Sequence, residues 1–259
     1  MAATAPFGAD VLERLAERHE IAYLLTRPDR PRGRGRRVAP PPAKAIAERL
    51  GIRVRQPERL GGSFDPEVET VVTVAYGELV PRDVLARSRW LNVHPSLLPR
   101  WRGAAPVERA LMAGDEETGV SVIELVEELD AGPIAACRRV RIEPDDDAGV
   151  VFGHARGLSP DLIEQALANT DPVPQSHEGV TYADKITAAD RELDWSRPSQ
   201  ELHNRIRALS PHIGARAEVE GRRVIVWRSR IVDGRLELLE VQPEGRRRMT
   251  YDEFRRGLR

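Results

Sequence analysis

Through the first two thirds of the chain, segments with the continuous apolar runs of buried strands alternate with segments whose apolar residues have helical spacing. Residues 71–75, Val-Val-Thr-Val-Ala, form an uninterrupted run that is typical of a strand buried on both faces of a parallel sheet. Helical spacing predicts helices at 8–18, 43–50, 81–87 and 105–112, and apolar runs predict further strands at 21–25, 52–54 and 90–93. This alternation predicts an α/β fold, a Rossmann-like doubly wound parallel sheet.

The pattern continues and then changes. A strand at 120–125, an edge strand at 134–142 and a helix at 150–167 complete the α/β part. Residues 171–179 hold two prolines among polar neighbours, which indicates a linker. Short strands are then expected at 192–195, 216–220, 224–228 and 236–241, with helices at 198–209 and 251–258. Together they predict a small OB-like β-barrel, and hence domains 1–170 and 191–259 joined by 171–190.

Composition narrows the class of protein. A formal net charge of -1 gives no global attraction to nucleic acid, so any polyanion must bind through local clustering. The single cysteine, Cys137, excludes an intramolecular disulfide and a cysteine-built metal site, and the histidines lack metal-ligand spacing. No apolar run reaches the roughly 20 residues of a membrane span. We therefore expect a cytoplasmic protein that needs neither membrane nor metal.

One segment is locally basic. Residues 27–37 hold six arginines against one aspartate, and prolines at 28, 31 and 40–42 argue against a persistent helix or strand. We expect a mobile loop here. It is either a solvated loop or a polyanion-binding loop whose glycines let the backbone follow phosphates.

The polar residues of the stretch 91–106 suggest chemistry. Asn92 and His94 are two apart on a predicted strand end, so their side chains project to one face, where an amide and an imidazole can polarise a carbonyl oxygen. Pro95 and Pro99 stiffen the following loop, and Gly103 and Pro106 suit a helix start. Considered by itself, His94 could equally be a structural histidine.

A second candidate lies downstream. Asp130 follows the strand at 120–125, in the turn Leu-Asp-Ala-Gly-Pro. An aspartate before alanine and glycine is most often a turn residue that accepts hydrogen bonds from backbone amides. The pattern of residues leaves its role open.

Two motifs together resemble the methionyl-tRNA formyltransferases. Residues 92–106, Asn-Val-His-Pro-Ser-Leu-Leu-Pro-Arg-Trp-Arg-Gly-Ala-Ala-Pro, resemble the family's Asn-x-His-x-Ser-Leu-Leu-Pro motif, and 129–133 resemble its aspartate loop. Residues 179–186 and 194–196 resemble the entry to its C-terminal domain. The basic segment resembles the loop with which the family engages the tRNA acceptor end, which implies tRNA-binding roles for Arg30, Arg32, Arg34, Arg36 and Arg37.

The resemblance implies transfer of a formyl group from 10-formyltetrahydrofolate to the α-amine of methionine on initiator tRNA. Asn92 and His94 are then the expected oxyanion donors. Asp130 is expected to carry the proton, directly or through a water, and to set the protonation of His94. The folate pocket is expected to be lined by Tyr76, Gly77, Ser96, Leu97, Leu98 and Pro99.

Two departures from the family pattern carry expectations. The family opens with a β-strand before the part that residues 3–7 match, whereas here Met1 has no strand in front of it. We expect the central first strand to be missing, leaving a gap or a substitute strand between 21–25 and 71–75, and a natural chain that begins further upstream. The C-terminal domain also looks short, because 232–235 pass directly into 236–239.

Two alternatives stay open. The acceptor could be glycinamide ribonucleotide or a nucleotide-linked amino sugar, although the basic segment and the β-rich C-terminal part argue against both. A catalytically inactive RNA-binding relative is motivated by the missing strand. In the favoured interpretation the protein is a monomer whose partners are initiator methionyl-tRNA and the folate donor.

Overall fold

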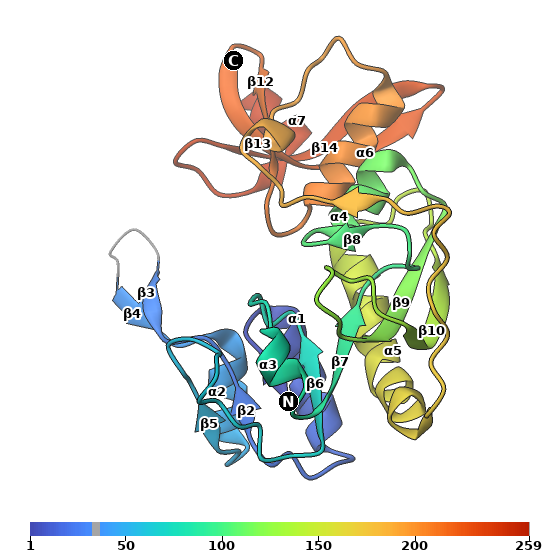
Figure 1. Cartoon of the computed structure of the whole chain (residues 1–259). Coiled ribbons are helices and arrows are strands. Elements are labelled where there is room, and N and C mark those ends of the chain that lie inside the picture. The colour runs from blue at the N-terminus through green and yellow to red at the C-terminus, as the bar shows by residue number, and fades with distance from the viewer. Residues whose placement is uncertain (33–36, 259) are drawn as a thin grey trace. The chain divides into compact units, whose positions relative to one another are not determined.

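The computed structural model describes residues 1–32 and 37–258 and divides the chain into two compact units (Figure 1). The first unit comprises Met1–Arg102, Gly119–Arg138 and Ala155–Val180. The second comprises Gly103–Thr118, Arg139–His154 and Thr181–Arg259. Because the chain passes between them several times, three long elements have residues in both units.

The first unit is built on a seven-stranded sheet. Its strand order is β10-β9-β7-β6-β1-β2-β5, in which β5, β2, β1, β6 and β7 are parallel and β9 runs antiparallel to β7. The strands are β1 (Ala2–Ala3), β2 (Leu24–Leu25), β5 (Val54–Arg55), β6 (Thr70–Val74), β7 (Arg89–His94), β9 (Glu117–Glu124) and β10 (Ile134–Arg141). The chain order reverses between β1 and β6, so the carboxyl ends of these strands form the switch point at which α/β sheets bind ligands.

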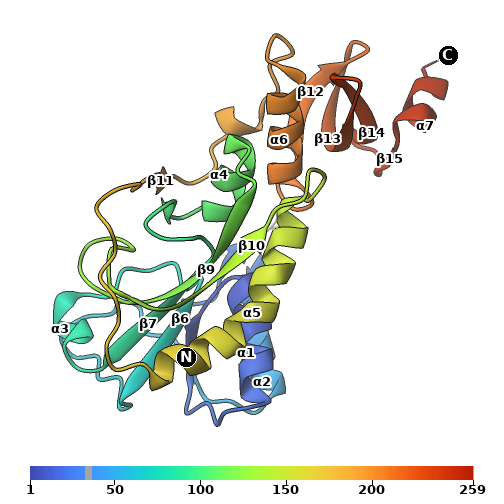
Figure 2. The ribbon, with the colours of Figure 1, turned by 90° about the vertical axis from the view of Figure 1, so that its right-hand side faces the viewer.

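Helices cover both faces of this sheet, which confirms the doubly wound prediction. Side chains of α1 (Pro6–Ala16) and α5 (Ala148–Ala168) pack with Val72, Val74 and Leu91 on one face, and α2 (Pro42–Arg49) packs beside α1. The opposite face carries α3 (Arg82–Leu85), whose Val84 packs with Val71 and Trp90. Figure 2 shows α1, α2 and α5 on one side of β6 and β7 and α3 on the other.

Of the two outcomes expected at the centre of the sheet, a gap or a substitute strand, the structure has the second. Ala2 and Ala3 are fully buried and form β1, in which Ala2 pairs with Leu25 on one side and with Thr73 on the other. β1 matches the two residues of β2 on one side and pairs with only Thr73 and Val74 of the five-residue β6 on the other. Gly8 in α1 lets the helix lie close to the sheet, since a Cβ there would collide with the carbonyl oxygen of Val74.

The basic segment is also more ordered than its prolines indicate. β3 (Arg30–Arg32) and β4 (Arg37–Ala39) pair antiparallel, with Pro31 opposite Val38, as a ribbon that projects from the first unit (Figure 1). The prediction that no strand persists here is wrong, because each strand of an isolated pair has a free edge on which proline is tolerated. We call residues 30–32 and 37–39 the basic ribbon. Arg34 and Arg36 lie outside the described residues.

The second unit packs helices on a four-stranded antiparallel sheet of order β12-β13-β14-β15. Its core joins Leu202 and Ile206 of α6 to Val224, Val226 and Val241 of the sheet. Its other elements include a short β8–β11 pairing and a 3-10 turn, Ala189–Arg191. The bounds are β8 (Arg102–Gly103), α4 (Pro106–Ala113), β11 (Tyr182–Ala183), α6 (Ser199–Leu209), β12 (Ala215–Val219), β13 (Arg222–Val232), β14 (Arg235–Pro243), β15 (Met249–Thr250) and α7 (Tyr251–Arg256).

The β-rich part of this unit has the strands expected of the small C-terminal domain, although the unit also takes in residues 103–118 and 139–154, which the prediction placed in the first domain. The pairings among the described strands form an open sheet in place of the predicted OB-like barrel. Residues 192–195 are not a strand, and only Glu192 makes an isolated bridge, to Arg216. No helix in the described part of the chain is both long and apolar enough to span a bilayer.

Candidate active site

The candidate site begins at the carboxyl end of β7. Asn92 and His94 lie two residues apart on this strand, as predicted, and His94 is buried with 4% of its surface exposed. On the neighbouring strand β6, the hydroxyl of Thr73 lies 2.7 Å from Oδ1 of Asn92. Because the hydroxyl donates to this oxygen, the Nδ2 donors of Asn92 face away from β6.

Asp130 arrives at the same place from the loop after β9. Nδ2 of Asn92 donates to Oδ1 of Asp130 over 3.4 Å, and Nδ1 of His94 lies 3.6 Å from Oδ2 of Asp130. Asp130 is 8% exposed and has a left-handed backbone with φ +50°. The structure therefore brings together the three residues that the sequence singled out for catalysis.

The imidazole of His94 has a defined orientation. Its Nε2 lies 2.8 Å from the carbonyl oxygen of Trp101, and because a carbonyl only accepts, Nε2 carries a hydrogen. Nδ1 then faces the carboxylate of Asp130. The candidate site therefore places two groups that can donate or accept a proton side by side.

The loop after β7 is fixed by hydroxyl groups. Ser96 is fully buried and its Oγ donates to the carbonyl oxygen of Arg100 over 2.7 Å. Ser121 of β9 donates to the carbonyl oxygen of Ser96 over 2.8 Å and accepts from the amide of Leu98 over 3.2 Å. Leu98 is also buried, whereas Leu97 and Pro99 are partly exposed. Of the predicted folate-lining residues here, Ser96 and Leu98 shape the loop from inside.

The carboxyl end of β6 contributes Tyr76 and Gly77. Gly77 is exposed, but Tyr76 is buried and its hydroxyl donates to Glu78 over 3.1 Å. Burial, together with the adjacent Glu78 carboxylate, raises the pKa of the Tyr76 hydroxyl above its usual range. Nearby, Nε of Arg27 is buried, makes no hydrogen bond among the described residues and lies 4.0 Å from Oε1 of the same Glu78. The exposed Gly77 thus follows a buried tyrosine whose hydroxyl is fixed by a paired carboxylate.

Sequence reasoning missed three residues that hold this site. Thr73 looked like one member of a strand run, and Arg102 like part of a stiff motif. Gln175 lies in the stretch that was interpreted as a linker, yet its amide donates to the carbonyl oxygens of Asp130 and Gly132. The alternation of side chains along β6 is the only sequence signal that could have put Thr73 on the same face as Asn92. No sequence signal indicated Gln175.

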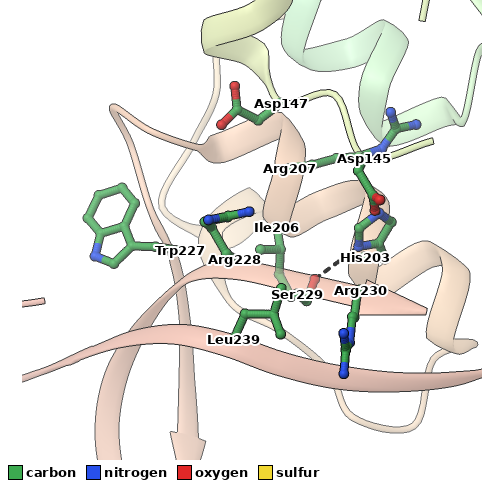
Figure 3. A pocket seen from close by; sticks show the side chains of 10 residues that line it. All are labelled: Asp145, Asp147, His203, Ile206, Arg207, Trp227, Arg228, Ser229, Arg230 and Leu239. Carbon is green, nitrogen blue, oxygen red and sulfur yellow. Dashed lines mark hydrogen bonds and ion pairs between the residues drawn. The ribbon is translucent and has the colours of Figure 1, made fainter. Parts of the chain in front are cut away.

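The second unit contains a separate small cavity of about 120 Å³ (Figure 3). The His203 imidazole lies in it, with Nδ1 3.0 Å from the hydroxyl of Ser229 and Nε2 3.1 Å from the carbonyl oxygen of Pro144. This volume is well below the roughly 300–1,000 Å³ of small-molecule sites. Within the described ranges, no three His, Cys, Asp or Glu residues gather as metal ligands would.

Family models of formyl transferases and curated methionyl-tRNA formyltransferases match this chain. The family model described as formyl transferase matches residues 1–167, and the formyl transferase C-terminal domain matches residues 185–235. A methionyl-tRNA formyltransferase of Cereibacter sphaeroides is 40% identical over 97% of this chain and 93% of its own length. That of Ruegeria pomeroyi is 42% identical over 89% of this chain and 81% of its own.

Solved structures share the fold. The methionyl-tRNA formyltransferase from Clostridium thermocellum superposes with a TM-score of 0.65 at 16% identity, covering 93% of this chain and 96% of its own. An N-formyltransferase from Helicobacter canadensis, solved with folinic acid and dTDP-3-aminofucose, gives a TM-score of 0.67 at 16% identity, covering 90% and 87%.

Proposed function

The chain belongs to the methionyl-tRNA formyltransferase family, and on that premise we propose that Asn92, His94 and Asp130 transfer the formyl group of 10-formyltetrahydrofolate to the α-amine of methionyl-initiator tRNA. The observation that carries this proposal is the meeting of an amide, an imidazole and a carboxylate at one strand end.

The reaction forms one C–N bond and breaks another. The methionyl amine attacks the formyl carbon, the formyl oxygen becomes an oxyanion, and the carbon then separates from N10 of the folate. Nδ2 of Asn92 is the donor best placed for that oxygen, because Thr73 holds the other end of the amide. A preorganised donor of this kind stabilises an oxyanion by roughly 2.7–4 kcal/mol.

One proton must move from the attacking amine to N10. The His94–Asp130 pair lies where it can exchange a proton with the reacting atoms, directly or through a water. Since Nε2 of His94 donates to Trp101, the imidazole acts through Nδ1 alone. Asp130 therefore takes up the proton of the attacking amine as the new C–N bond forms and returns it to N10 as the C–N10 bond breaks, while the His94 donor supports the oxyanion.

The two substrates use different parts of the first unit. We assign the folate to the loop of residues 96–99 and to Tyr76 and Gly77, where exposed backbone at Gly77 and the partly exposed Leu97 and Pro99 offer contact. The basic ribbon is assigned to the tRNA, and Arg30 is exposed there. The same role is assigned to Arg32, Arg34, Arg36 and Arg37. We also propose that the protein is a cytoplasmic monomer.

The alternatives are weighed by specific observations. The Helicobacter canadensis relative was solved with a nucleotide-linked amino sugar, which keeps that acceptor as the second candidate. The inactive-relative interpretation depended on a missing central strand, and β1 fills that position.

An acceptor panel tests the assignment. Purified protein with 10-formyltetrahydrofolate is offered charged initiator tRNA, glycinamide ribonucleotide or a dTDP-amino sugar, and formyl transfer is measured for each. We expect transfer to the charged tRNA alone. Transfer only to a small acceptor would replace the proposed substrate, and folate-independent RNA binding without transfer would indicate the inactive relative.

A further inference from the structure

We infer that Gln175, fixed by Arg102, is a positioning residue that sets the direction of the Asp130 carboxylate. This inference rests on the proposed role of Asp130 in proton transfer. Gln175 lies in the polar segment 171–179, more than forty residues after Asp130 in the sequence. The inference gives this segment a role in positioning a catalytic group.

The Asp130 loop needs support, because its backbone takes an uncommon conformation. With φ +50°, Asp130 is left-handed, which aspartate adopts more readily than most residues but not by default, so the surrounding contacts hold it there. Gly132 supplies one constraint, since its Cα lies so close to the carbonyl oxygen of Glu124 that a Cβ would collide with it. That contact fixes one end of the loop, and the amide of Ala131 donates to the carbonyl oxygen of Glu128 over 3.3 Å, so the carbonyl oxygen of Asp130 is the group of this peptide that needs a further partner.

The Gln175 amide provides this second constraint. Its Nε2 lies 2.7 Å from the carbonyl oxygen of Asp130 and 2.7 Å from that of Gly132. Each of the two hydrogens on Nε2 is donated to one carbonyl oxygen, so the amide holds the chain on both sides of residue 131 and all of its donors are used. We call this pair of hydrogen bonds the clamp. Rotation of the Asp130 peptide, which would swing its carboxylate away from Asn92 and His94, must break one of these hydrogen bonds.

Arg102 holds the clamp in the correct orientation. Its Nε and Nη2 both donate to Oε1 of Gln175, at 3.2 and 2.9 Å, so a flipped amide would place NH₂ against a cation. Nη1 donates to Glu128, at the start of the same loop, over 3.0 Å. Arg102 is only 6% exposed, so its guanidinium is a buried hydrogen-bond donor that fixes neighbouring groups and is not a surface charge.

Precise placement matters at this site. Nδ1 of His94 and Oδ2 of Asp130 are 3.6 Å apart, slightly beyond hydrogen-bond distance, so a small rotation of the loop changes whether a proton can pass between them. A misplacement of about 1 Å costs on the order of 10²-fold in rate. Loss of the clamp should therefore lower kcat and leave folate binding largely unchanged.

The test uses the full chain with paired variants. Gln175→Met keeps the size of the side chain and removes its hydrogen bonds, and Gln175→Glu keeps the contact with Arg102 but presents oxygens to both carbonyls. We expect each to lower kcat by roughly 10- to 100-fold, with KM for the folate within about twofold. Asn169→Ala is the matched control, because Asn169 also donates from its amide to a backbone carbonyl, that of Ala135, at 2.8 Å.

Combination with Asp130→Asn separates positioning from general stability. If Gln175 acts through Asp130, Gln175→Met should change kcat by less than about twofold when Asp130 is already Asn, because residues acting as a unit are not additive. Full additivity, or a kcat of Gln175→Met equal to that of Asn169→Ala, would overturn the inference. Unimpaired turnover of Asp130→Asn alone would instead contradict the proposed function itself.

Discussion

The hydroxyl of Thr73 on β6 lies 2.7 Å from Oδ1 of Asn92 on β7, and this contact decides which end of the Asn92 amide faces the reaction. The same hydroxyl lies 3.1 Å from the carbonyl oxygen of Leu91. If the proton went to Leu91, the amide would turn its oxygen toward the Asp130 carboxylate, where two acceptors would repel. The arrangement with Nδ2 toward Asp130 avoids this repulsion and gives the carboxylate a donor.

Thr73→Val should therefore lower kcat, because it keeps the shape of the strand and removes the hydrogen bond that orients Asn92. One hydrogen bond is worth about 0.5–1.5 kcal/mol, so a loss of roughly threefold to tenfold is expected. Thr73→Ser keeps the hydroxyl and should keep most of the activity. Steady-state kinetics together with melting temperatures check this, and equal activity of the Val and Ser variants would remove the orienting role.

Arg30→Ala should weaken binding of the charged tRNA, because Arg30 is an exposed cation on the basic ribbon. Loss of one phosphate contact should lower the slope of log affinity against log salt concentration by about 0.7–0.9. Binding is measured across a salt series, with Arg59→Ala as an exposed control outside the ribbon. A slope that falls equally in both variants would show that the ribbon has no special role.

Asp190 should make the second unit sensitive to acid. Hydrogen bonds from Arg109, at 2.8 and 3.0 Å, and from Thr187 hold the pKa of Asp190 well below its usual range. A depressed carboxyl pKa stabilises the fold above the unfolded pKa of about 3.9, and this stability is lost as pH falls through the folded value. The contribution is therefore present at pH 7 and absent in strong acid.

Asp190→Asn should lower the melting temperature at pH 7, and the difference from the unmodified protein should shrink as pH falls below about 4. Thermal unfolding over a pH series measures it. Glu244→Gln, at an exposed position, serves as the control. A difference that stays constant with pH would mean that the ionised carboxylate is not the stabilising species.

The parts of the fold that were predicted correctly are those with a strong local pattern. The apolar run at 71–75 anticipated β6, and the helical spacing at 198–209 anticipated α6 almost to the residue. Asn92 and His94 were found because two residues on one strand necessarily share a face.

The remainder depended on contacts that are distant in sequence. β1 is two alanines long and carries no periodicity, so only its partners Leu25 and Thr73 reveal it as a strand. The basic ribbon forms because its two strands satisfy each other in spite of Pro31. Gln175 could not be singled out, since its role comes from Arg102 and from carbonyl groups, which every residue possesses.

The most direct measurement is the turnover of Asp130→Asn in folate-dependent formylation of methionyl-initiator tRNA, with folate affinity determined on the same sample. The substitution preserves size and removes the carboxylate that faces His94 at 3.6 Å. Kcat should fall by about 10²- to 10⁴-fold while the Kd for the folate stays within about twofold, because a proton carrier and not a binding group is lost. Turnover close to that of the unmodified protein, or a loss confined to folate binding, would contradict the account.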